Sequence, residues 1–266
     1  MQLSLNGRNA IVTASGGGIG RRIAELFHQA GARLFLCDID EKALDETIAA
    51  LPGSFGMVVD VADRAQVDRF MDRALKELNG LDILVNNAGI AGPTGPIEEI
   101  DPDEWQRTLD VNLNGLFYCT RRAVPALKQS GGGSIVNLAS AAGRFAFPMR
   151  SPYSATKWGV VGVTRTLSVE LGEYGIRVNA ILPGSVAGPR IEAVLSAKAK
   201  ARGIGEEEMR TEMLAPISEG IRDRDRCGQH GALSLLRCRT ARHRAEPECR
   251  CRHRISRLTP YFRITP

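Results

Sequence analysis

Long hydrophobic runs and cysteine are both scarce in residues 1–217 of the chain. No stretch approaches the ~18 consecutive apolar residues that a membrane-spanning helix needs, and residues 1–9 lack the apolar core of a secretory signal. The two cysteines of this part, Cys37 and Cys119, lie in apolar runs, where a thiol packs as a small core residue. These absences argue against a membrane protein and against a disulfide framework. We therefore expect a cytoplasmic protein with no membrane partner.

Acidic and basic residues are balanced in this part of the chain and unbalanced after it. Residues 1–217 hold 23 Lys plus Arg against 25 Asp plus Glu, whereas residues 218–266 hold 12 Arg, no Lys and five acidic residues. The excess of positive charge thus belongs to the last segment alone. A chain of 266 residues fits one large α/β domain with a substantial core. We expect a single domain over residues 1–217, followed by an atypical Arg- and Cys-rich tail over residues 218–266.

The tail is open to several interpretations. It could imitate a zinc site, but the spacing of its cysteines and histidines matches no usual zinc pattern, and we expect no metal; these residues are Cys238, His243, Cys249, Cys251 and His253. Its arginines could attract nucleic acid electrostatically, although we expect no nucleic-acid partner. It could also be a disordered extension, because neither helical nor strand periodicity persists after Ile217.

Apolar runs alternate with segments of helical spacing along residues 1–217, which is typical of βαβ units in a parallel sheet. The pattern predicts a doubly wound α/β fold, with a mostly parallel sheet of six to seven strands flanked by helices. Strands are expected over 9–14, 33–37, 54–59, 82–85, 134–138 and 176–182, and helices over 19–30, 41–51, 64–78, 103–129, 154–174 and, as two pieces broken near Gly203 and Gly205, over 191–214.

A glycine-rich turn joins the first expected strand to the first expected helix. Glycine lets the backbone approach a pyrophosphate, and the helix N-terminus presents unpaired amides to it. Such a turn alone is weak support, because glycine-rich turns connect many strands and helices. The candidate cofactor-binding residues of this turn are Ser15, Gly16, Gly18, Ile19 and Gly20.

Asp38 ends the second expected strand, at the spacing from Gly20 where a carboxylate can accept hydrogen bonds from the hydroxyls of an adenosine ribose. A 2′-phosphate at the same place would be repelled, so the sequence favours NAD over NADP. Asp38 could instead be a solvated acid or the cap of the helix from Glu41 onward. Arg21 and Arg22 could in turn favour a phosphate.

Tyr153 and Lys157 are one helical turn apart within an expected helix, and they share one face of it. A phenol with its ordinary pKa of ~10 is a poor acid–base catalyst at neutral pH, and a nearby ammonium favours the phenolate. A tyrosine and a lysine at this spacing also occur by chance as a surface pair. Ser140, which precedes Tyr153 at the end of an expected strand, and Asn112, in a helical segment, strengthen the catalytic interpretation.

These residues resemble the short-chain dehydrogenase/reductase family, over roughly residues 5–217. The motifs match that family in order and spacing: Asn86-Asn87-Ala88-Gly89, Asn112, Ser140, Tyr153, Lys157 and Pro183-Gly184, with Asp60-Val61 where the family contacts adenine. One departure is Ala14, which stands where the family usually has its first glycine; a methyl group is tolerated there if the backbone angles stay negative.

The resemblance implies a role for each matching residue. Tyr153 would transfer the hydroxyl proton, Ser140 would orient the substrate oxygen, and Lys157 would bind the nicotinamide ribose and favour the phenolate. Asn112 would hold a water that extends a proton relay. The implied cofactor contacts are Asp60, Val61, Asn87, Ala88 and Gly89, together with Tyr153, Lys157, Pro183, Gly184 and Val186.

The implied reaction is hydride transfer between a nicotinamide and a secondary alcohol or ketone, in a homotetramer or homodimer. Residues 142–151 and 188–217 should line the substrate pocket, with Phe145, Phe147, Met149 and Ile191 as apolar walls or as core packing. A 3-oxoacyl thioester, a cyclic ketone and a polyol are all compatible. Two other functions stay open: a 3-oxoacyl (acyl-carrier-protein) reductase that uses NADP, and a catalytically inactive dinucleotide-binding protein.

The tail lacks the helix, the last strand and the Val-Asp-Gly-Gly-like segment with which family members usually end. A composition rich in Arg, Cys and His arises when GC-rich coding sequence is read out of frame, and we hypothesise a frameshift near residues 217–222. If the tail is expressed, we expect the sheet to lose its last strand and expose an apolar edge, which would lower stability, alter assembly or weaken activity.

Overall fold

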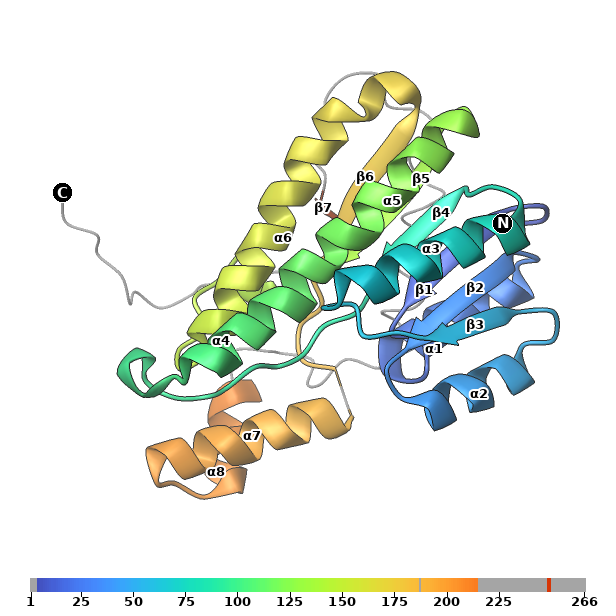
Figure 1. The fold of residues 1–266 in the computed structure, drawn as a ribbon. Helices are drawn as coiled ribbons and strands as arrows, with labels where there is room; N and C mark the ends of the chain where they lie inside the picture. The colour runs from blue at the N-terminus through green and yellow to red at the C-terminus, as the bar shows by residue number, and fades with distance from the viewer. Residues whose placement is uncertain (1–3, 187, 215–247, 250–266) are drawn as a thin grey trace.

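A computed structural model describes residues 4–186, 188–214 and 248–249. Within these residues, seven strands form one parallel sheet in the order β3-β2-β1-β4-β5-β6-β7 (Figure 1). The strands are β1 (Asn9–Thr13), β2 (Arg33–Asp38), β3 (Phe55–Val58), β4 (Ile83–Asn86), β5 (Gly133–Leu138), β6 (Ile176–Ile181) and β7 (Glu248–Cys249). The predicted doubly wound sheet of six to seven strands is confirmed.

Helices alternate with the strands and cover the sheet on both faces, with α3, α5 and α6 on the face turned toward the viewer of Figure 1. Several begin at aspartates that accept hydrogen bonds from first-turn amides: Asp40 from Ala43, and Asp63 from Ala65 and Gln66. The helices are α1 (Gly18–Gln29), α2 (Glu41–Ala50), α3 (Arg64–Leu78), α4 (Pro102–Leu109), α5 (Gly115–Gln129), α6 (Ser151–Glu170), α7 (Pro189–Arg202) and α8 (Glu206–Leu214).

The expected helix over 103–129 is interrupted. It begins at the Asp101 cap, but a π-helical turn, η2 (Asp110–Asn114), separates α4 from α5. The amide of Asn112, within this turn, bonds the backbone of Ile90 and the hydroxyl of Thr156. π-turns are frequent at functional positions, and these tertiary bonds could not be inferred from helical periodicity.

The expectation that the sheet loses its last strand is wrong. β7 pairs with β6 in parallel, with Ala180 opposite Glu248 and Ile181 opposite Cys249. The pairing is only two residues long, so it satisfies backbone groups near the carboxyl end of β6 and leaves the rest of that edge without a described neighbour. The tail's candidate metal ligands Cys238, His243, Cys251 and His253 lie outside the described residues, as does the position of the hypothesised frameshift.

A buried polar ladder crosses the middle of the sheet. Asn86 of β4 donates to Thr120 at 3.0 Å and to Asn137 of β5 at 2.9 Å, and Asn137 donates to Thr164 of α6 at 2.9 Å. All four side chains are buried. Because unpaired buried amides are costly, the ladder fixes the register of β4, β5 and the helices that cover them.

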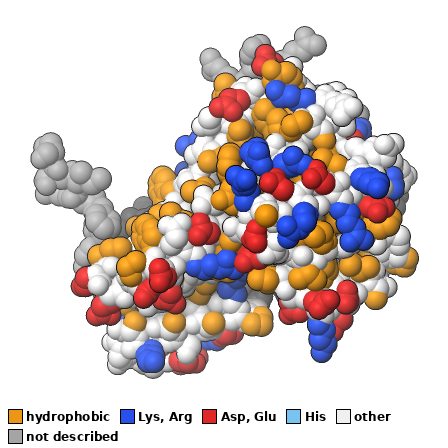
Figure 2. Space-filling view, in the orientation of Figure 1, with side chains coloured by type: hydrophobic (Ala, Val, Ile, Leu, Met, Phe, Trp, Pro, Cys, Tyr) orange, Lys and Arg blue, Asp and Glu red, His pale blue; other side chains and the backbone are white. Residues whose placement is uncertain are grey.

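On the outer surface, basic and acidic side chains lie next to one another over α3 and α5 (Figure 2). Arg121 contacts Asp68 at 2.9 Å, and Arg122 contacts both Asp68 and Asp72. Each of these exposed pairs contributes little to stability, but together they connect α3 to α5. None of the described helices is long and apolar enough to cross a membrane.

Candidate active site

The glycine turn lies where the carboxyl end of β1 meets the N-terminus of α1. Gly17 is the N-cap of α1 and offers no side-chain acceptor, so the first amides of the helix are left for another partner. Gly20 is required by packing, because a Cβ there would lie 2.0 Å from the carbonyl oxygen of Ala14. A Cβ on Gly17 or Gly18 would meet nothing within 4 Å. This open turn with unpaired amides fits a pyrophosphate.

Two other predicted residues of the turn face the protein rather than the open side. The hydroxyl of buried Ser15 donates to the carbonyl of Cys37 at 3.2 Å and ties the turn to β2. Ile19 packs against the hydrophobic core between the sheet and α1. Both residues therefore support the turn from beneath.

Ala14 departs from the condition set for it. Its φ is +51°, in the left-handed region that favours glycine, so the negative backbone angles under which a methyl group is tolerated are not present. The carbonyls of Thr13 and Ala14 both accept hydrogen bonds from the amide of Asn87, at 3.0 and 2.8 Å. These bonds hold Ala14 in the left-handed backbone conformation that a glycine adopts readily.

Asp38 lies beside the glycine turn, and its carboxylate accepts from the amide of Gly16 at 2.8 Å and from that of Asp40 at 3.1 Å. The alternative role of Asp38 as cap of α2 is wrong, since Asp40 is that cap. Arg21 and Arg22 both bond Glu25, at 3.2 and 3.0 Å.

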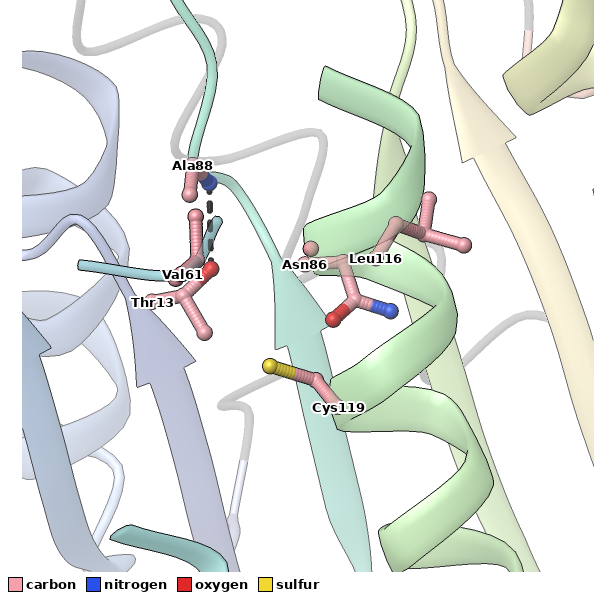
Figure 3. A pocket seen from close by; sticks show the side chains of 7 residues that line it. Thr13, Val61, Asn86, Ala88, Leu116 and Cys119 are labelled. Atoms are coloured by element: carbon pink, nitrogen blue, oxygen red, sulfur yellow. Dashed lines mark hydrogen bonds between the residues drawn. The ribbon is translucent and has the colours of Figure 1, made fainter. Parts of the chain in front are cut away.

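The adenine-contacting candidates lie near one small cavity at the carboxyl ends of β1 and β4. Its lining includes Thr13, Val61, Ala88 and Cys119 (Figure 3). The Thr13 hydroxyl accepts from the amides of Asn87 and Ala88, both at 3.0 Å. Asp60 is not among the residues that line this cavity, and its side chain pairs with Arg107 at 2.8 Å.

Asn112, Gly89 and Lys157 come together at the next strand ends. A Cβ on Gly89 would lie 3.1 Å from Oδ1 of Asn112 and 3.4 Å from Nζ of Lys157. Asn112 is 2% exposed, and its Nδ2 donates to Ile90 O at 3.1 Å and to Thr156 at 3.1 Å. The predicted asparagine therefore contacts the same loop as the predicted lysine.

Lys157 is 4% exposed, and its Nζ donates to the carbonyl of Leu138 at 2.7 Å. Nζ lies 5.6 Å from the centre of the Tyr153 ring, so the two side chains of α6 face each other across one helical turn. Burial, with a smaller contribution from Arg190, lowers the pKa of Lys157 to about 7. The ammonium can thus lose its proton near neutral pH.

Ser140 lies two residues after the end of β5 and caps a short 3-10 turn, where its hydroxyl accepts from the amide of Ala142 at 3.2 Å. This turn packs on α6, since a Cβ on Gly143 would lie 2.5 Å from the carbonyl oxygen of Lys157. Pro183 is adjacent, and its carbonyl accepts from the amide of Ala141 at 2.9 Å. Gly184 and Val186 are half-buried in the segment that follows. No hydrogen bond joins Ser140 to Tyr153 within the described residues.

Three residues near the site were not singled out by sequence reasoning. Arg150, 2% exposed, lies one turn before Tyr153, and its guanidinium carbon is 5.0 Å from that ring. Lys198 of α7 is 7% exposed, and Arg190 donates to the carbonyl of Gly89. The i, i+3 spacing from Tyr153 could have identified Arg150; the two residues of α7 carried no comparable signal.

The residues present thus fit a dinucleotide, and the parallel sheet with its glycine turn at the first strand–helix junction defines a dinucleotide-binding fold. No group of three or more potential ligands among His, Cys, Asp and Glu surrounds a metal position in the part of the chain described. The model of the short chain dehydrogenases matches residues 8–199. The chain belongs to that family, whose members are oxidoreductases acting on CH–OH groups with NAD(P).

Three relatives illustrate the similarity. The 2-dehydro-3-deoxy-L-rhamnonate dehydrogenase (NAD(+)) of Sphingomonas sp. is 40% identical over 186 residues, which cover 70% of this chain and 75% of the relative. The 3-ketoacyl-(acyl-carrier-protein) reductase of Brucella melitensis, complexed with NADH, has a TM-score of 0.77 at 29% identity, with 87% and 92% of the two chains covered. A variant of actinorhodin polyketide ketoreductase with NADPH has a TM-score of 0.81 at 30% identity, with 86% and 90% covered.

Proposed function

We propose that this chain is an NAD-dependent dehydrogenase that interconverts a secondary alcohol and a ketone. The observation that carries the proposal is the buried Lys157 ammonium, 5.6 Å from the ring of Tyr153 and in contact distance of the glycine loop after β4. Burial of a lysine is costly, and buried groups with shifted pKa values cluster at functional sites. A bound nicotinamide supplies the acceptor or donor for the hydride.

Side chains of the protein transfer the proton and bind the substrate oxygen. Tyr153 takes the hydroxyl proton during oxidation and returns it during reduction, and Ser140 holds the same oxygen. Lys157 favours the phenolate and binds the ribose of the nicotinamide, while Asn112 holds a water that carries the proton onward. Pro183, Gly184 and Val186 border the nicotinamide, and the backbone amides of the open glycine turn hold the pyrophosphate.

The test is Tyr153→Phe, which keeps the ring and removes the proton. We expect kcat to fall by about two to four orders of magnitude, as general acid–base catalysis contributes that much. Dinucleotide binding, followed by nicotinamide fluorescence, should persist, because the phenol is not needed to hold the pyrophosphate. Wild-type turnover in this variant would refute the role of Tyr153. Binding without turnover in the unmodified protein would favour an inactive dinucleotide-binding protein.

NAD is the proposed cofactor, although the relatives bind either form: one bears NAD(+) in its name, and the two solved relatives hold NADH and NADPH. Asp38 supports NAD because its carboxylate lies beside the turn and would repel a 2′-phosphate. Arg21 and Arg22, the alternative phosphate partners, bond Glu25 instead. A comparison of kcat/KM for the two cofactors tests this choice, and a clear preference for NADP would contradict it and favour the 3-oxoacyl reductase.

We further propose assembly into a homotetramer or homodimer. Large apolar side chains are exposed on α5 and α6: Phe117 at 55%, Trp158 at 53% and Val169 at 82%. Large apolar side chains left exposed on these helices support a subunit contact there. Sedimentation measurements on the wild type and on Trp158→Ser provide the test, with a smaller species expected for the variant.

A further inference from the structure

Arg150 is a buried cation whose donors are incompletely used. It precedes the first residue of α6, is 2% exposed, and donates from Nη2 to the carbonyl of Ala91 at 2.6 Å. Its Nε and Nη1 atoms are buried, and among the described residues neither has a hydrogen-bond partner. A buried guanidinium with unpaired donors is strongly unfavourable unless an acceptor reaches it.

Arg150 is adjacent to the proposed reaction centre. Its guanidinium carbon lies 5.0 Å from the centre of the Tyr153 ring, on the helix that also presents Lys157 to that ring. A group that accepts from Arg150 would therefore be only a few covalent bonds from an oxygen that meets the Tyr153 hydroxyl. A small molecule would satisfy these donors if its reacting carbon and an anionic group are close together.

Lys198 places a second cation beside the same aromatic residue, Phe147. Its Nζ is 4.0 Å from the centre of the Phe147 ring, and the guanidinium carbon of Arg150 is 5.6 Å from it. Burial, followed by repulsion from Arg150 and Arg202, lowers the pKa of Lys198 to about 8.

Two carboxylates of the neighbouring helices are engaged elsewhere. Glu192 of α7 bonds Arg210, and Glu212 of α8 bonds Arg202. No ion pair to Arg150 or Lys198 is formed within the described part of the chain. Two buried positive groups thus border one aromatic ring without a counter-ion from the described residues.

We propose that Arg150 and Lys198 form an anion site that binds a carboxylate of the substrate, so that the enzyme oxidises a short hydroxy acid to the corresponding oxo acid. This inference rests on the proposed function. The carbinol C–H bond breaks and its hydrogen and two electrons pass to NAD, the hydroxyl proton passes to Tyr153, and the C–O bond becomes a carbonyl. NADH and one proton are the other products, and the carboxylate is unchanged.

The experiment compares α-, β- and γ-hydroxy acids with their methyl esters as substrates of the full chain with NAD. We expect an acid to exceed its ester in kcat/KM by about tenfold or more, because charge-assisted hydrogen bonds are about twice as strong as neutral ones. Lys198→Met should reduce this acid-to-ester ratio about tenfold, mainly through the KM of the acid. Arg150→Met should reduce it further, and Arg150→Lys should restore part of it.

Lys200→Met is the matched control, because Lys200 is an exposed residue of the same helix and its removal changes the charge equally. It should leave the ratio unaltered. If Lys198→Met and Arg150→Met lower acid and ester turnover equally, the two residues are structural and the anion site is refuted. A preference for phosphate monoesters of the same length over hydroxy acids would refute the proposal that the bound anion is a carboxylate.

A binding experiment distinguishes failure of this inference from failure of the proposed function. Butyrate and butyramide are compared by thermal shift on the NAD-saturated protein, and butyrate alone should stabilise the wild type but not Lys198→Met. Selective stabilisation by butyrate in a protein that turns over no alcohol would uphold the anion site and refute the dehydrogenase. Turnover of neutral alcohols without any effect of butyrate would uphold the dehydrogenase and refute the anion site.

Discussion

Lys157 should make the folded protein less stable at neutral than at alkaline pH. Burial and Arg190 lower its pKa in the folded state from 10.5 to about 7, whereas the unfolded chain keeps the ordinary value. Between these two pKa values the unfolded state binds more protons than the folded state, and stability rises with pH wherever that holds. The destabilisation is therefore full below the folded pKa and disappears as the pH rises through the unfolded one.

The expected size follows from the shift. From pH 7 to pH 9 the free energy of unfolding should rise by about 2 kcal/mol on account of Lys157 alone. Lys157→Met removes the titrating group and keeps an unbranched side chain. It also leaves the Leu138 carbonyl without its Nζ donor, a loss of about 1 kcal/mol that does not depend on pH.

Urea unfolding of wild type and Lys157→Met at pH 7, 8 and 9 measures this difference. The stability gap between the two proteins should shift by about 2 kcal/mol in favour of the wild type as the pH rises. Lys198 titrates in both proteins, so its contribution cancels in the stability difference. The exposed Lys200→Met variant should show the same pH dependence of stability as the wild type. Parallel stability curves for wild type and Lys157→Met would show that Lys157 is not buried as a costly cation.

Two further substitutions test the local structure. Ala14→Gly should raise stability by about 1 kcal/mol, measured by urea unfolding, because glycine adopts a φ of +51° without a Cβ penalty; an unchanged or lower stability would refute the strained conformation. Asn137→Ala should lower stability by about 2 kcal/mol, since it leaves donors and acceptors of Asn86 and Thr164 unpaired in the core; a loss no larger than that of an exposed alanine substitution would contradict the buried ladder.

The features that the sequence predicts are those set by short, local sequence patterns. Strands and helices up to Leu214 follow hydrophobic periodicity, and the structure breaks the chain near Gly203 and Gly205 as expected. The pairing of Tyr153 with Lys157 follows from the helical repeat alone. The position of Asp38 at the end of the second strand also follows from the sequence pattern, and the structure has its carboxylate beside the glycine turn.

The rest depends on tertiary contacts that no short pattern encodes. The π-turn at Asn112 is fixed by bonds to Ile90 and Thr156, from two other segments. The positive φ of Ala14 is held by Asn87, 73 residues away. The strand β7 forms where periodicity had failed, because the backbone of β6 offers unpaired groups to any extended segment.

Arg150, Lys157 and Lys198 concentrate buried positive charge on one part of the fold. Elsewhere, described arginines such as Arg107 pair with carboxylates at the surface, where the charge is solvated. The buried three are 2%, 4% and 7% exposed, and burial lowers the pKa of each. Their desolvation destabilises the free protein, and the carbonyls of Ala91 and Leu138 offset it in part for Arg150 and Lys157. Negative charge or acceptors that arrive with a ligand would offset it further. A bound anion would therefore stabilise the fold through Arg150 and Lys198.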